Sequence, residues 1–149
     1  VVRFADDLVL VAGELVGVLG AGTMGAGIAQ VAAQSGMDVL LYDVSADMVE
    51  RGLANIKHVL QSRVDKGKME PSEMEGVLRR ITTTIDRDSA ADAPLVIEAA
   101  PEDLELKREL FAQLSGICGP EVVLATNTSS LPARPFSARP TISSACPRP

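Results

Sequence analysis

Short apolar runs alternate with longer segments of helical periodicity along this 149-residue chain, and this alternation constrains its fold more than any other feature. The runs have the length of buried strands and are too short to cross a membrane as helices. They occupy residues 14–20, 37–44, 93–100 and 121–130. Because parallel strands are joined through helices, the pattern predicts an α/β fold with a Rossmann-type, doubly wound and mostly parallel sheet.

Individual residues mark the limits of the helices between these runs. Gly36 is suited to end the first helix, and Ser45 can cap the second. The second helix is expected to break at Gly67, and a further helix to start near Pro71. Apolar stripes are predicted at Val49, Leu53, Ile56, Leu60 and Val64, and later at Leu104, Leu110, Phe111 and Leu114.

Composition narrows the function classes. A formal net charge of −6, no basic stripe and few aromatic residues argue against nucleic-acid binding. Cys118 and Cys146 fit no metal-binding or C-x-x-C spacing, so we expect no metal site and a reducing, cytoplasmic location. Residues 1–13 lack the basic start of a signal peptide and are expected to be a non-targeting extension.

A glycine motif stands at the exit of the first predicted strand and opens the first helix. Gly20 permits a tight turn, Gly22 has no Cβ to block an approaching pyrophosphate, and Gly25 lets the helix pack closely. The N–H groups at the start of the helix then face the anion. The predicted phosphate-binding loop is Gly20, Ala21, Gly22, Thr23, Met24 and Gly25.

Asp43 ends the second predicted strand, where dinucleotide-binding folds place an acidic residue. Its carboxylate can accept hydrogen bonds from the adenosine ribose and would repel a 2′-phosphate. No basic residue follows it until Arg51, so NAD is favoured over NADP. The alternatives are that the glycines serve only packing and Asp43 a turn, or that FAD or another nucleotide binds.

Longer blocks of sequence indicate a family. The segments "GVLGAGTMGAGIAQVAAQSGMDVLLYDVS", "LVIEAAPEDLELKRELFAQL" and "LATNTSSL" occur in order between about residues 15 and 131. Together they resemble the N-terminal, NAD-binding domain of the 3-hydroxyacyl-CoA dehydrogenases, particularly the bacterial 3-hydroxybutyryl-CoA dehydrogenases. The resemblance implies NAD-dependent oxidation of a 3-hydroxyacyl-CoA to the 3-ketoacyl-CoA, in fatty-acid or butanoate metabolism.

The resemblance also implies roles for residues beyond the glycine loop and Asp43. Glu102 and Lys107 would lie beside the nicotinamide half of the cofactor. Ser129 would reach the substrate's 3-oxygen and the nicotinamide, and Asn127 would shape that catalytic loop. Lys66 or Lys68 would contact the CoA moiety.

Several of these residues also have plain structural interpretations. Glu102 could be a first-turn acid that favours the helix dipole, and Lys107 a solvated residue paired with Asp103. Ser129 could be an ordinary loop residue after a strand. The role of Glu98 stays open between cofactor edge and strand end, and His58 is expected on the surface.

The last part of the sequence departs from the resemblance. Residues 132–149 hold five of the nine prolines and three arginines, so we expect neither the next helix nor the next strand, and a largely disordered tail. The family's general base is a His in an "HFFNP"-like segment, and the sequence has none. We therefore expect a truncated chain, with or without an out-of-frame end, or a short protein whose Pro/Arg tail binds a partner.

The sequence predicts three segments of the chain and leaves several functions open. We expect an extension at 1–13, an NAD-binding domain at 14–131 and an aberrant tail at 132–149, without the family's helical substrate and dimer domain. The chain would bind NADH and self-associate through exposed apolar surface, but turn over poorly. The alternatives are a non-catalytic NAD-sensing module or a degenerate product without activity.

Overall fold

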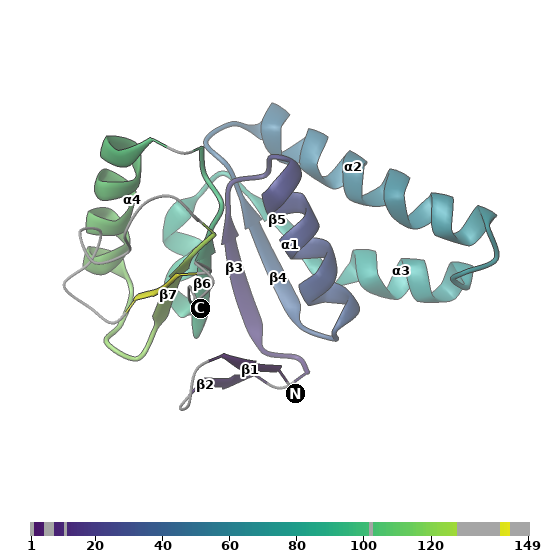
Figure 1. Cartoon of the computed structure of the whole chain (residues 1–149), viewed down its shortest axis with the longest axis horizontal. Helices are drawn as coiled ribbons and strands as arrows, with labels where there is room; N and C mark the ends of the chain where they lie inside the picture. The colour runs from purple at the N-terminus through teal and green to yellow at the C-terminus, as the bar shows by residue number, and fades with distance from the viewer. Residues whose placement is uncertain (1, 5–7, 11, 102, 128–140, 144–149) are drawn as a thin grey trace, which may run out of the picture.

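The computed structural model describes residues 2–4, 8–10, 12–101, 103–127 and 141–143, and its centre is a six-stranded parallel sheet (Figure 1). The strand order is β5-β4-β3-β6-β7-β8. The chain starts this sheet at β3, runs outward to β5, and then crosses back to β6, so the order reverses between β3 and β6. This topology confirms the predicted Rossmann-type, doubly wound sheet. The strands are β3 (Leu15–Leu19), β4 (Asp38–Tyr42), β5 (Ile81–Thr84), β6 (Leu95–Glu98), β7 (Val123–Thr126) and β8 (Thr141–Ser143).

Helices cover both faces of the sheet, which explains why its strands are continuously apolar. In β4, Val39 and Leu41 pack into the core under α1, α2 and α3, whereas Leu40 and Tyr42 pack into the core under α4. The 3-10 helix η1 (Arg87–Asp92) lies on the α4 side. The other helices are α1 (Thr23–Gln34), α2 (Ala46–Asp65), α3 (Pro71–Arg79) and α4 (Leu104–Ile117).

The helix ends follow the sequence signals. Gly36 has a φ of +90° directly after α1, and the Ser45 hydroxyl accepts a hydrogen bond from the Met48 N–H at 3.3 Å. The break between α2 and α3 falls between Asp65 and Pro71, as predicted. The apolar stripe of α2 is confirmed, since Val49, Ile56 and Leu60 are buried and Leu53 and Val64 are half-buried.

Two short elements lie outside the predicted alternation. β1 (Val2–Phe4) and β2 (Leu8–Leu10) form an antiparallel pair within the segment expected only as an extension. β8 pairs in parallel with β7, so the expectation of no further strand after residue 131 is wrong for Thr141–Ser143. These residues contain no proline; Pro140 comes directly before them, a position where proline is compatible with a strand.

None of the helices in the described part of the chain is long and apolar enough to span a membrane.

Candidate cofactor site

A cleft of about 820 Å³ opens where strands β3, β4, β6 and β7 end. This is the position at which open α/β sheets bind ligands, next to the reversal of strand order. The residues that line it come from the glycine loop, the ends of β4 and β7, the segment after β6, η1 and α4. They include Gly20, Gly22, Thr23, Met24, Asp43, Val44, Met48, Arg87, Ala99, Ala100, Pro101, Leu106, Lys107, Glu109, Leu110, Gln113 and Asn127.

The glycine loop has the geometry that its spacing predicts. Gly20 has a φ of +106°, and a Cβ there would lie 2.7 Å from the Ala99 carbonyl oxygen. A Cβ on Gly25 would overlap the carbonyl group of Gly20, so only glycine lets α1 start this close to β3. A Cβ on Gly22 would meet no atom within 4 Å, and Gly22 lines the cleft. Gly22 therefore leaves room for a ligand, whereas the other two shape the loop.

The N-terminus of α1 is left open toward the cleft. The first N–H bonded within the helix is that of Ala26, which donates to the Gly22 carbonyl oxygen at 2.9 Å. The N–H groups of Thr23, Met24 and Gly25 precede it, and in the described chain no side chain caps this end and no acid lies in its first turn. By contrast, α2 and α4 begin with a capping side chain and an acidic first turn. Such an uncapped helix start is a site for an anionic group.

Asp43 connects the end of β4 to the glycine loop. Its Oδ2 accepts a hydrogen bond from the Ala21 N–H, and its Oδ1 accepts one from the Val44 N–H, both at 2.7 Å. A carboxylate has about four lone-pair sites, so acceptor capacity remains for ligand hydroxyls. The nearby Arg51 is paired with Asp47 at 3.0 Å and is exposed, so its charge is already partnered. This arrangement fits a ribose better than a ribose phosphate.

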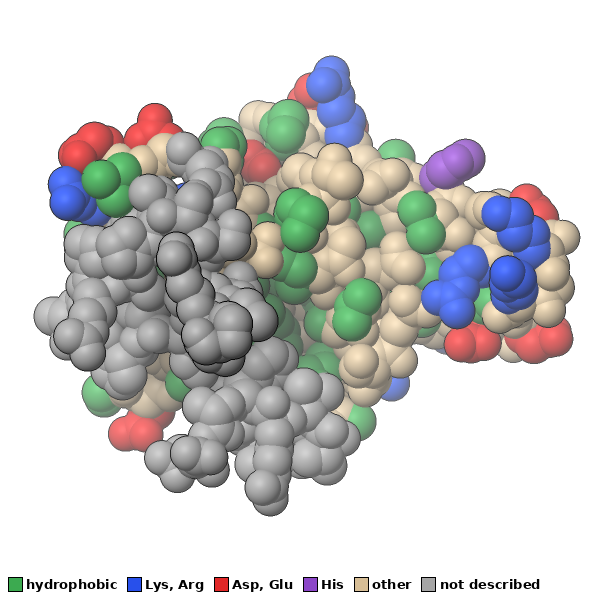
Figure 2. Space-filling view, in the orientation of Figure 1, with side chains coloured by type: hydrophobic (Ala, Val, Ile, Leu, Met, Phe, Trp, Pro, Cys, Tyr) green, Lys and Arg blue, Asp and Glu red, His purple; other side chains and the backbone are tan. Residues whose placement is uncertain are grey.

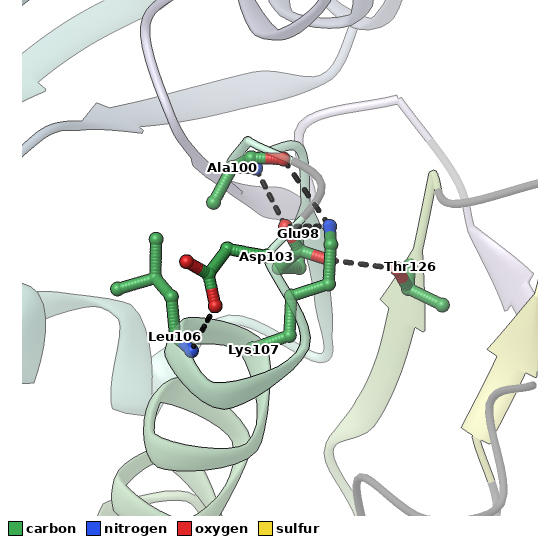
Figure 3. Close-up of polar contacts among 6 residues, drawn as sticks. All are labelled: Glu98, Ala100, Asp103, Leu106, Lys107 and Thr126. Carbon is green, nitrogen blue, oxygen red and sulfur yellow. Dashed lines mark hydrogen bonds and ion pairs between the residues drawn. The ribbon is translucent and has the colours of Figure 1, made fainter. Parts of the chain in front are cut away.

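Lys107 lies on the opposite side of the cleft and is buried, with 1% of its surface exposed. Its Nζ donates to both carboxylate oxygens of Glu98 at 2.8 Å and to the Ala100 carbonyl oxygen at 3.2 Å (Figure 3). The interpretation of Lys107 as a solvated partner of Asp103 is therefore wrong. Asp103 instead caps α4, because its Oδ1 accepts from the N–H groups of Glu105 and Leu106 at 3.0 and 3.1 Å.

Glu98, whose role the sequence left open, is the centre of this buried group. Its Oε1 also accepts from the Ala100 N–H, and its Oε2 from the Thr126 hydroxyl, both at 2.6 Å. Its backbone carbonyl accepts from the Asn127 N–H at 2.9 Å. Asn127 itself is half-buried and lines the cleft, and its role in shaping the loop after β7 stays a prediction.

Other predicted site residues are not brought to the cleft. Lys66 and Lys68 are exposed in the turn after α2, at the far end of a 20-residue helix that is about 30 Å long. His58 is exposed on α2, as predicted, and Figure 2 shows this histidine on the surface. The predicted residues Glu102 and Ser129 lie outside the described part of the chain.

Of the apolar residues on the rim of the cleft, Met24 was predicted from the sequence as part of the cofactor site, whereas Val44, Leu106 and the polar edge were not. Met24, Val44 and Leu106 are exposed by 59%, 81% and 45%. Met24 belongs to the glycine motif, and Val44 directly follows Asp43, so the sequence held a signal for both positions. The polar edge, where Arg87 donates to the Gln113 side chain, depends on η1, which no sequence pattern marked.

The described residues contain no group of three or more His, Cys, Asp or Glu side chains suited to hold a metal ion.

Known proteins resemble this chain over most of its length. The family model described as "3-hydroxyacyl-CoA dehydrogenase, NAD binding domain" matches residues 15–143. The match runs past residue 131, where the sequence analysis ended the resemblance. The chain is 50% identical over 118 residues to the 3-hydroxyadipyl-CoA dehydrogenase of Escherichia coli, covering 79% of this chain and 25% of the relative. It is 43% identical over 121 residues to a probable 3-hydroxybutyryl-CoA dehydrogenase of Bacillus subtilis, covering 81% and 42%.

Solved structures agree with these sequence relatives. The crystal structure of 3-hydroxybutyryl-CoA dehydrogenase from Escherichia coli superposes with a TM-score of 0.82 at 47% identity, covering 86% of this chain and 27% of that chain. The (S)-3-hydroxybutyryl-CoA dehydrogenase from Ralstonia eutropha gives a TM-score of 0.81 at 36% identity, covering 84% and 44%. The chain thus spans between a quarter and about two-fifths of the length of the curated relatives named here.

Proposed function

Because this chain belongs to the family of 3-hydroxyacyl-CoA dehydrogenase NAD-binding domains, we propose that it is the cofactor-binding part of an enzyme that oxidises a 3-hydroxyacyl-CoA to the 3-ketoacyl-CoA. NAD is the cofactor of this family of domains. One observation carries the proposal for this chain: the open N-terminus of α1, the space beside Gly22 and the Asp43 carboxylate all face one end of the cleft.

The adenosine and pyrophosphate parts of the cofactor have clear candidates. Residues 20–25 would hold the pyrophosphate through backbone N–H groups and the positive end of the α1 dipole. The free lone pairs of Asp43 would accept hydrogen bonds from the ribose hydroxyls, and its charge would disfavour a 2′-phosphate. The residues present therefore fit NAD and discriminate against NADP.

The nicotinamide half would lie across the crevice, toward the ends of β6 and β7. Lys107 and Asn127 line that side, and the family resemblance adds Glu102 and Ser129 there. When bound, NAD accepts a hydride from the substrate carbon that carries the hydroxyl group. Asn127 and Ser129 would orient that end of the site.

A second part of the proposal concerns turnover by the 149-residue chain. Oxidation of a hydroxyl group needs a general base, and histidine suits this role near neutral pH. His58, the single histidine, is exposed on α2 and does not line the cleft. We therefore expect the chain to bind NADH without turning over acyl-CoA substrates at an enzymatic rate.

Titration of NADH fluorescence, with reduction of acetoacetyl-CoA measured on the same sample, tests both parts. Saturable NADH binding with turnover near the uncatalysed rate is the expected result, and NADPH should bind more weakly than NADH. Gly22→Val fills the space left for the pyrophosphate, and Asp43→Ala removes the ribose acceptor, so each should weaken binding by tenfold or more, about the effect of losing 1.4 kcal/mol.

Gly76→Ala is the matched control, because a Cβ at Gly76 meets no atom within 4 Å and Gly76 lies in α3, away from the cleft residues. NADH binding that survives both Gly22→Val and Asp43→Ala unchanged would overturn the proposed site. Rapid acetoacetyl-CoA reduction that His58→Ala abolishes would overturn the expectation of low turnover.

Self-association is a further expectation. Val31 and Ile85 are exposed by 62% and 60%, and β5 ends the sheet on one side. Unpaired strand edges and exposed apolar side chains promote association. Light scattering over a concentration series should show a mass above that of the monomer.

A further inference from the structure

Glu98 is a wholly buried carboxylate that does not line the cleft. Its exposed fraction is 0%, and Thr126, which donates to it, is exposed by 2%. The cleft-lining residues include neither of these two, but they include Ala100, Lys107 and Asn127. Each of those three is hydrogen-bonded directly to Glu98. Glu98 therefore reaches a ligand in the cleft only through other residues.

The buried group around Glu98 and Lys107 satisfies its own hydrogen-bonding atoms. An ammonium group has three N–H donors, and Lys107 directs them to Glu98 Oε1, Glu98 Oε2 and the Ala100 carbonyl oxygen. Each carboxylate oxygen of Glu98 accepts two bonds: Oε1 from Lys107 and Ala100, and Oε2 from Lys107 and Thr126. All three N–H donors of Lys107 are therefore used within this group.

The group also fixes elements that are distant in the sequence. β6 and β7 are paired so that Glu98 lies opposite Thr126, and Lys107 belongs to the first turns of α4. As Figure 3 shows, dashed contacts converge on Glu98 from the segment after β6, from α4 and from β7. One carboxylate thus sets the relative positions of three segments that form one wall of the cleft.

This wall faces the half of the cleft opposite Asp43. Dinucleotides bind across the crevice at the reversal of strand order, with one half on each side. Asp43 directly follows β4 on one side of β3, and Glu98 ends β6 on the other. We infer that Glu98 is a positioning residue for the nicotinamide half of the cofactor and that the Thr126 hydroxyl orients its carboxylate. This inference rests on the proposed function.

Thr126→Val tests the inference, with Thr126→Ser as its matched control. Valine keeps the branched shape of threonine but removes the O–H that donates to Glu98 Oε2, whereas serine keeps the O–H. Binding of NADH and of ADP-ribose, which lacks the nicotinamide, is measured by calorimetry. Because a lost bond to a charged group is only partly transmitted to the ligand, we expect the NADH dissociation constant of Thr126→Val to rise about fivefold.

The ADP-ribose dissociation constant should stay within about twofold of wild type, and Thr126→Ser should restore the NADH value. A purely structural role of Thr126 would weaken both ligands alike, and that result would overturn the inference. So would unchanged NADH binding in Thr126→Val. Failure of the wild-type chain to bind either ligand would instead overturn the proposed function.

The wild-type chain supplies a second measurement if Thr126→Val does not fold. In ¹⁵N-resolved NMR spectra, the Ala100 and Asn127 amides should shift on adding NADH beyond the shifts caused by saturating ADP-ribose. Identical shifts with the two ligands would overturn the inference.

Discussion

Replacing Lys107 by methionine isolates the energetic role of the buried ion pair. Methionine has a similar length and no charge, so the Glu98 carboxylate keeps only the Ala100 N–H and Thr126 hydroxyl as donors. Removing one partner of a buried ion pair costs about 3–5 kcal/mol, because the other charge stays buried. That loss is a large part of the roughly 5–15 kcal/mol that stabilises an ordinary domain.

Urea unfolding followed by circular dichroism measures this loss. With a slope of about 2 kcal/mol per molar urea, the expected loss lowers the midpoint by about 2 M. Arg108→Met is the control: it also replaces a basic residue by methionine, at the next residue of α4, where Arg108 pairs with Glu105 at 3.0 Å in an exposed position. Exposed pairs contribute about 0.2–1 kcal/mol, so the midpoint of this variant should shift by less than about 0.5 M.

A double variant separates charge from packing. In Glu98→Gln with Lys107→Met no charge stays buried, so we expect the double variant to be more stable than Lys107→Met alone, by about 1–3 kcal/mol. If Lys107→Met unfolds at the same urea concentration as Arg108→Met, the buried pair does not hold the domain together. A double variant whose loss equals the sum of the two single losses would equally refute the reasoning.

Three further changes, with Gly76→Ala as a control, test the glycine loop and a helix cap. A Cβ on Gly52 would lie 2.6 Å from the Ala21 carbonyl oxygen, so Gly52→Ala should lose about 1 kcal/mol in a urea titration despite its better helix propensity. Gly76→Ala, with open space at its Cβ, should gain up to about 1 kcal/mol; equal effects at the two glycines would contradict the close approach. In Asp43→Asn only the amide oxygen can accept a hydrogen bond, so either the Ala21 N–H or the Val44 N–H loses its acceptor. The free energy of unfolding measured without ligand should therefore fall by about 1–3 kcal/mol. Asp103→Ala removes the α4 cap and should cost about 1 kcal/mol in thermal unfolding, and no change would show that the cap is dispensable.

The sequence predicted the features that depend on neighbouring residues. The order of strands and helices follows from hydrophobic periodicity, and the ends of α1 and α2 follow from Gly36 and Ser45. The shapes around Gly20 and Gly25 follow from the need for a positive φ and for close packing. Most of these features are decided within a few residues of the chain, whereas the close approach of Gly20 to Ala99 comes from the pairing of β3 with β6.

The sequence did not reveal the Glu98–Lys107 pair, because its partners are brought together by packing. Local reasoning paired Lys107 with Asp103, four residues away on the same helix. Two signals were nevertheless present. Lys107 shares the helical spacing of the buried Phe111 and Leu114, so it lies on the inner face of α4. Glu98 and Thr126 end adjacent parallel strands, which places them side by side at the cleft edge.

In the proposed site, the backbone of the glycine loop would be the main attraction for the anionic part of a dinucleotide. Lys107 is the lysine that lines the cleft, and Glu98 neutralises it. Arg51, beyond Asp43, is paired with Asp47, and the Arg87 guanidinium donates to Gln113 at the α4 edge. The open N–H groups of α1 are therefore the donors best placed for a pyrophosphate, and the absence of a cap and of first-turn acids in this described helix preserves their positive potential. Because this attraction would come from fixed dipoles at close range, the position of the glycine loop should govern affinity. Asp43 holds that loop by accepting from the Ala21 N–H, and Gly52 lets α2 pack closely against the Ala21 carbonyl group.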